Sequence, residues 1–153
     1  MKNMRKIERQ MTAEETLEVL NKGEYGVLST VDSEMQTHGT PISYVNIAGK
    51  VYFHCALEGL KLDNILINPK VCFTVVGKTK VLPDKFSTEF ESIMAYGKAS
   101  IIQGEEKILV LREIIKKYSP EFIESGEQYI SKAAEKTCVV KIDVNHITGK
   151  HRV

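Results

Sequence analysis

Residues 40–54 read Thr40-Pro-Ile-Ser-Tyr-Val-Asn-Ile-Ala-Gly-Lys-Val-Tyr-Phe-His54, and this stretch decides the fold. Its β-branched and aromatic residues predict two strands, Thr40 to Ile47 and Val51 to His54. The Ala48-Gly49 pair between them leaves room only for a tight turn, so neighbouring strands must run antiparallel. The stretch therefore predicts an antiparallel β-structure.

A further strand and a helix precede this hairpin. Tyr25 to Val31 is rich in β-branched residues and is followed by the polar loop Asp32 to Thr37, which extends the prediction to a β-meander. Ahead of it, the sequence Thr12-Ala-Glu-Glu15 has the form of a capping box. This motif predicts a helix from Ala13 to Lys22 that ends at Gly23.

The rest of the chain adds three strands and three helices, judged from hydrophobic periodicity and from where prolines fall. The predicted strands are Val71 to Val76, Ser92 to Ile102 and Thr137 to Val144; the predicted helices are Glu58 to Asn68, Glu105 to Tyr118 and Phe122 to Ala134; and Lys78 to Ser87 is predicted to be a loop. Six strands with few helices do not show the regular alternation of a parallel sheet. We expect one mostly β (α+β) domain over residues 1–153, closed into an antiparallel barrel with flanking helices.

Composition narrows the class of protein. The 153 residues are 42% hydrophobic and 27% charged, as in ordinary globular domains, and the net charge is +1. Basic residues alternate with acidic ones instead of forming a stripe, which argues against nucleic acid as a partner. No apolar run approaches the ~20 residues of a membrane span, and no secretory signal is recognisable. Three widely spaced cysteines without a C-x-x-C motif suit a reducing compartment, so we expect a cytoplasmic protein.

Several common catalytic motifs are missing from the chain. It contains neither the glycine-rich dinucleotide fingerprint nor a Walker phosphate loop, and no nucleophile elbow. The four histidines form no close pair of the kind that binds zinc, so no metal site is expected.

The junction His54-Cys-Ala-Leu-Glu-Gly-Leu-Lys-Leu-Asp-Asn64 carries the strongest functional signal. A helix that begins here would present free amides and a positive dipole end to an anion. Lys61 would add a full charge, and Gly59 would let the backbone approach a phosphate. The alternative for Lys61 is a solvated side chain. For His54 the alternatives are contact with a ring system or proton transfer, and a structural hydrogen bond to a backbone carbonyl.

The segment His54 to Pro69, with its lysine, helix and Asn-Pro end, resembles the FMN-binding segment of the pyridoxamine 5′-phosphate oxidase-like split barrels. Ser92 to Ala99 resembles a later strand of that family. Gly26 to Val31, His38 to Tyr44 and Thr148 to Lys150 are similar to its nitroimidazole-resistance (Nim-type) branch. The resemblance spans Arg5 to Lys150 and implies a six-stranded split β-barrel that forms a homodimer with FMN at the interface.

The resemblance also assigns roles by position. Lys61 would meet the FMN phosphate, while the backbone of residues 40–43 would line the isoalloxazine ring. Residues 54–56 would follow the ribityl chain, and Ser92 would come from the second chain. The implied cofactor-binding residues are Thr40, Pro41, Ile42, Ser43, His54, Cys55, Ala56, Gly59, Lys61, Asn64 and Ser92.

Three functions are compatible with these residues. The leading hypothesis is a reductase in which reduced FMN passes electrons to a small planar acceptor, such as a nitro-aromatic compound or a quinone, with His54 as the candidate catalytic proton donor. The second is a non-catalytic protein that binds FMN, haem or another planar ligand. The third is a cofactor-free dimeric module with Lys78 to Glu91 as its partner surface. Gly39 and Leu60 stand where the oxidases of the family carry arginines, which argues against vitamin B6 oxidation.

Overall fold

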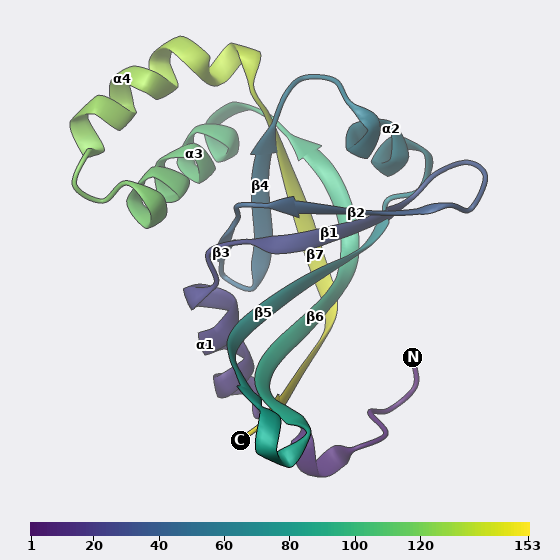
Figure 1. The fold of residues 1–153 in the computed structure, drawn as a ribbon. Helices are drawn as coiled ribbons and strands as arrows, with labels where there is room; N and C mark the ends of the chain where they lie inside the picture. Colours follow the sequence, from purple (N-terminus) through teal and green to yellow (C-terminus); the bar gives the residue numbers. More distant parts are fainter.

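A computed structural model describes residues 1–153 and contains one antiparallel sheet with four α-helices (Figure 1). The strands are β1 (Gly26–Val31), β2 (Thr37–Ile42), β3 (Val45–Ile47), β4 (Lys50–Cys55), β5 (Lys70–Leu82), β6 (Ser87–Ile102) and β7 (Cys138–Arg152). The helices are α1 (Ala13–Lys22), α2 (Leu60–Ile67), α3 (Gly104–Tyr118) and α4 (Ile123–Ala133). The strand order is β2-β1-β5-β6-β7-β4-β3, with every pair antiparallel.

The two strands at the ends of this order, β2 and β3, are consecutive in sequence. Only Ser43 and Tyr44 separate them, yet β2 pairs with β1 and β3 pairs with β4. The chain therefore passes from one edge of the sheet to the other at this point and closes the barrel.

This crossing corrects two predictions. The predicted strand Thr40 to Ile47 is two strands, so the sheet has seven strands where six were expected. The predicted β-meander is wrong, because the front of the chain forms two separate hairpins. Strand-forming residues continue through the break, and residue type does not reveal where a strand changes its partner.

Helix α1 matches its prediction at both ends. Thr12 Oγ1 accepts a hydrogen bond from the Glu15 amide at 3.1 Å, and the Thr12 amide donates to Glu15 Oε2 at 2.8 Å. This capping box starts the helix, which buries Val19 and Leu20 in the barrel interior.

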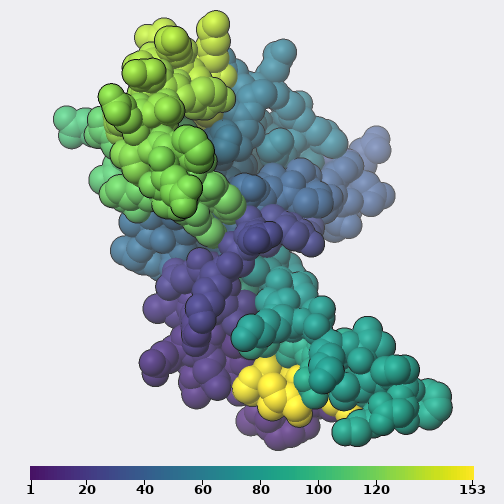
Figure 2. Space-filling model, turned by 60° about the vertical axis from the view of Figure 1, so that its left-hand side comes forward, coloured from purple at the N-terminus to yellow at the C-terminus, as the bar shows by residue number.

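Strands β5 and β6 form a long hairpin that corrects the predicted loop Lys78 to Ser87. After an irregularity between Val76 and Thr79, β5 continues to Leu82, and β6 already begins at Ser87. The hairpin projects from the barrel as an arm beside the C-terminus (Figure 2). Polar residues on both faces of this exposed arm remove the alternation that would identify strands. Strand β7 extends to Arg152, and its prediction ended early at Val144 because the residues after Val144 also lack a clear alternation.

Two apolar cores follow from the alternation of side chains along the strands. Inside the barrel, Phe53 of β4 packs with Phe73 and Ile93, and helices α1 and α2 contribute to the same core. On the outer face, Tyr52 of β4 packs in a second core beneath α3 and α4, which lie together beside the sheet (Figure 1). Helix α2 is therefore held in place by the barrel interior. None of the helices combines the length and apolar character needed to cross a membrane.

Candidate functional site

The junction between β4 and α2 exposes the start of a helix. Strand β4 ends at Cys55, four residues follow, and Gly59 precedes the helix with φ 152° and ψ 168°. This backbone conformation is essentially restricted to glycine, and a Cβ at Gly59 would meet no atom within 4 Å. The first helical hydrogen bond runs from the Asp63 amide to the Gly59 carbonyl at 3.1 Å. The amides of residues 60–62 thus have no partner within the helix.

Lys61 adds a positive charge to this helix start. Its side chain is half-buried, and none of the seven ion pairs in the structure involves it. An unpaired lysine in the first turn, together with free amides and the positive end of a helix dipole, makes this helix start a candidate site for an anion. Both alternatives for Lys61, a phosphate ligand and a solvated side chain, stay predictions.

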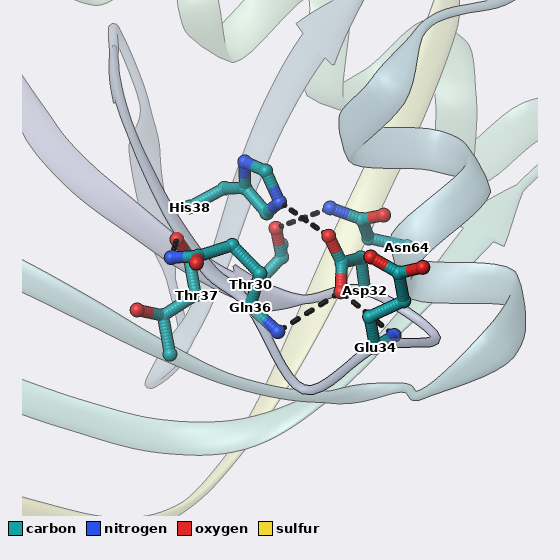
Figure 3. A network of polar contacts seen from close by, with 7 residues as sticks. All are labelled: Thr30, Asp32, Glu34, Gln36, Thr37, His38 and Asn64. Carbon is teal, nitrogen blue, oxygen red and sulfur yellow. Dashed lines mark hydrogen bonds and ion pairs between the residues drawn. The ribbon is translucent and has the colours of Figure 1, made fainter.

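Asn64 lies on the other side of α2 and faces the barrel. It is 1% exposed, and its side-chain amide donates to Thr30 Oγ1 of β1 at 3.1 Å (Figure 3). Within this chain Asn64 therefore anchors α2 to β1 of the sheet, and this contact helps to fix the position of the helix start. Sequence reasoning missed Thr30, because nothing in the local pattern links two polar residues 34 positions apart.

Asn64→Ala is expected to lower the free energy of unfolding by about 1–3 kcal/mol, since the buried Thr30 hydroxyl loses its partner. The double variant Thr30→Val with Asn64→Leu removes both polar groups and is expected to be closer to the wild type. Urea denaturation of the three proteins measures both effects. A double variant as unstable as Asn64→Ala, or less stable, would contradict this account.

The turn between β1 and β2 is organised by Asp32 (Figure 3). Its Oδ1 accepts from the amides of Glu34 and Gln36, both at 2.9 Å, and its Oδ2 lies 2.9 Å from His38 Nε2. The hydrogen bond from His38, together with those backbone amides, holds the pKa of Asp32 below its usual value. This network sets the start of β2. An aspartate opening a turn is the signal that could have revealed it.

The four predicted residues at the end of β2 alternate in direction. Thr40 and Ile42 are half-buried, and Ile42 packs against the barrel core. Pro41 and Ser43 are exposed, and Ser43 lies in the break before β3. Ser43 also lines a groove of about 630 Å³ between the ends of α1 and α3. This segment offers its backbone and its exposed side to a ligand.

His54, Cys55 and Ala56 follow one another at the end of β4. His54 is exposed and makes no side-chain hydrogen bond within the chain, so the structural carbonyl cap is absent. Partial desolvation by the surrounding residues lowers the pKa of His54, which favours the neutral imidazole. Cys55 lies opposite Cys138, and burial raises its pKa to about 11, partly offset by the charge of Lys61. Cys55 is therefore a neutral thiol, and Ala56 is exposed.

Ser92 lies apart from this junction, on the outer face of the sheet. It lines a cavity of about 230 Å³ with Tyr96, His146 and Lys150 among others, and the Tyr96 and His146 rings lie 5.9 Å apart. The groove that Ser43 lines is separate from the cavity that Ser92 lines, so these two serines do not share a pocket within one chain. Tyr96 was not singled out from the sequence, although the alternation from Ser92 along β6 indicates that both face outward.

The predicted site residues therefore fall into three places: the β4–α2 junction, the end of β2, and the outer face of β6. No group of three or more His, Cys, Asp or Glu side chains could hold a metal ion. Within one chain, the arrangement offers a candidate anion site at the start of α2 and an exposed imidazole, that of His54, at the end of β4.

The fold defines a class: a split β-barrel with mostly antiparallel strands and flanking helices. The family model described as pyridoxamine 5′-phosphate oxidase matches residues 12–151, and the chain belongs to this family. The resemblance inferred from the sequence is thereby confirmed. A search of curated proteins found no match.

Several solved structures share the fold. One, described as a candidate 5-nitroimidazole antibiotic resistance protein from Bacteroides thetaiotaomicron, has a TM-score of 0.80 at 23% identity and covers 93% of this chain and 86% of its own. The flavocytochrome Anf3 from Azotobacter vinelandii has a TM-score of 0.84 at 20% identity, with coverages of 99% and 72%. The FAD and heme binding protein from Mycobacterium smegmatis has a TM-score of 0.76 at 14% identity, with coverages of 94% and 73%. At these identities the similarity is one of fold.

Proposed function

We propose that this protein binds FMN as a homodimer and passes electrons from the reduced flavin to a small planar acceptor, such as a nitro-aromatic compound or a quinone. The observation that carries the proposal is the β4–α2 junction, where free amides, an open glycine and an unpaired, half-buried Lys61 meet. A phosphate monoester carries about −1.5 to −2 charges at pH 7 and suits such a site.

Two further exposed groups, at the end of β2 and at the end of β4, are available for the rest of FMN. The exposed Pro41 and Ser43 leave the end of β2 accessible to a flat ring, and His54 is exposed. Two proteins with this fold are described as flavin proteins: a flavocytochrome, and an FAD and heme binding protein. Gly39 and Leu60 stand where the oxidases of the family carry arginines. Lys61 is therefore the one lysine or arginine in the segment from His54 to Asn64.

A homodimer is supported by the outer face of β6. Ser92 and Tyr96 are half-buried there and Met94 is exposed, whereas α3 and α4 pack over β3, β4 and β7. A second copy on this face would cover these side chains and bring Ser92 toward the flavin of its partner. Two symmetric sites per dimer would follow from the two-fold axis.

When bound, FMN supplies the hydride or electron transfer, and the protein supplies binding and orientation. Lys61 and the start of α2 hold the phosphate, and the backbone of residues 40–43 supports the ring. His54 offers a hydrogen bond beside the ring, and as the candidate proton donor its imidazole would first take up a proton from solvent and then pass it to the acceptor.

The test is an absorption spectrum of the purified protein, followed by titration with FMN while its fluorescence is recorded. Quenching that saturates at one FMN per chain is expected. Oxidation of NAD(P)H with a nitro-aromatic acceptor then distinguishes a reductase from a carrier. Protein that is colourless and leaves FMN fluorescence unchanged would refute the proposal.

A second candidate function is binding of haem or another planar ligand without turnover. It is favoured by the names of two structures with this fold, a flavocytochrome and an FAD and heme binding protein. A Soret band after addition of haem, without flavin binding, would support it.

A further inference from the structure

The break between β2 and β3 leaves backbone groups without strand partners. At Ser43 and Tyr44 the chain leaves β1 and has not yet joined β4, so the ladder supplies no hydrogen bond to Tyr44. Residues at the end of α3 supply the hydrogen bonds to the Tyr44 backbone instead. The Tyr44 amide donates to the Tyr118 hydroxyl at 2.9 Å, and the Tyr44 carbonyl lies 2.9 Å from both the Tyr118 hydroxyl and Lys117 Nζ.

Tyr118 connects this break to a second segment. Its hydroxyl also lies 2.6 Å from the carbonyl of Glu24, just before β1, so its single proton is shared between two carbonyls. Tyr44 itself is fully buried, and its own hydroxyl donates to the carbonyl of Leu20 in α1. Tyr44 is therefore held at both its backbone and its side chain.

Lys117 is an unusual member of this cluster. Its ammonium lies 3.8 Å from the centre of the Tyr44 ring, and it takes part in none of the ion pairs. Burial lowers the pKa of Lys117 to about 8. The other charged or titratable groups around the adjoining groove are Lys22, Glu24, Tyr25 and Tyr118.

We infer that Lys117 and Tyr118 are positioning residues: they hold the Ser43–Tyr44 break and thereby set the end of β2 on which the flavin ring is to rest. The inference rests on the proposed function, because residues 40–43 face FMN only if FMN binds. Neither residue touches the ligand in this account. Both act through the backbone of Tyr44.

A pH dependence follows from the charge on Lys117. Below pH 8 the ammonium is charged and donates strongly to the Tyr44 carbonyl, whereas above pH 8 the neutral amine is a weaker donor and loses its attraction to the ring. FMN affinity is expected to fall about threefold to tenfold between pH 7 and pH 9. Lys117→Arg keeps its charge over this range and is expected to lose the step.

The experiment compares Tyr118→Phe and Lys117→Gln with matched controls from exposed positions, Tyr129→Phe in α4 and Lys116→Gln in α3. FMN affinity is expected to fall about fivefold in the first two variants and to stay unchanged in the controls. Hydrogen–deuterium exchange of the ligand-free proteins is expected to be faster in residues 41–47 of the first two variants alone.

The two readouts separate the inference from the proposed function. Wild-type protein that binds no FMN refutes the proposed function. Faster exchange in residues 41–47 of Tyr118→Phe and Lys117→Gln would then still support the inference that these two residues hold the backbone of Tyr44. Unchanged exchange in both variants overturns the inference, as does a wild type that binds FMN with the same affinity as both variants. If FMN affinity still falls between pH 7 and pH 9 in Lys117→Arg, the charge of Lys117 does not cause the pH dependence.

Discussion

Lys61→Gln is expected to lower FMN affinity by about tenfold to a hundredfold, the larger of the binding effects proposed for this protein. The substitution keeps the side-chain length similar but removes the charge beside the free amides of α2. A hydrogen bond to a charged group contributes about 1.5–3 kcal/mol, which corresponds to this range. The loss is expected to shrink at high ionic strength, because salt screens the attraction in the wild type. Fluorescence titration with FMN at low and high salt measures it.

Two controls make this prediction specific to the phosphate. Lys70→Gln removes an exposed lysine at the start of β5 and is expected to leave FMN affinity unchanged. Riboflavin lacks the phosphate, so its affinity is expected to be the same for the wild type and for Lys61→Gln. Equal FMN affinities for the wild type and Lys61→Gln would exclude Lys61 as the phosphate ligand.

Gly97→Ala is expected to destabilise the fold by about 3 kcal/mol, the largest stability effect we expect from a single added methyl group. Strand β7 carries one extra residue, Asn145, opposite the step from Tyr96 to Gly97. At this bulge the two backbones approach so closely that a Cβ on Gly97 would lie 2.2 Å from the carbonyl oxygen of Asp143. Backbone atoms cannot move aside as a side chain can, so the strand pairing must shift.

Denaturation of Gly97→Ala beside Lys98→Ala measures this effect. Lys98 is the next residue of β6, it is exposed, and its replacement is expected to change stability by less than about 0.5 kcal/mol. The register of β6 and β7 also sets how Tyr96 and Ser92 face outward, so FMN binding by the dimer should weaken in Gly97→Ala. Two variants of equal stability would mean that the bulge relaxes at no cost.

Local patterns were sufficient where the determinants lie within a few residues of one another. Helix α1 was predicted with its bounds, because the capping box of Thr12 and Glu15 and the terminal Gly23 are themselves the contacts that start and end it. The start of a helix close to Gly59 was predicted in the same way, since its determinants belong to one short segment; the anion site there stays a prediction.

Predictions failed where partners are distant in sequence. The break at Tyr44 was read as continuous strand, because its cause is the change from β1 to β4 and its support comes from Tyr118, 74 residues away. The contact of Asn64 with Thr30, 34 residues away, was likewise not predicted; the assignment of Asn64 to the ligand stays a prediction. The contacts that decide these positions depend on the whole sheet, and no local periodicity encodes them.

The class of fold and the family could thus be inferred from the sequence alone, since both depend on the order and spacing of nearby residues. Only the tertiary structure decided how the barrel closes between β2 and β3, which residues hold that closure, and which face Ser92 occupies. The physical reason is that a backbone group gives up its hydrogen bonds to water only where a partner is present, and at Tyr44 that partner comes from a remote helix.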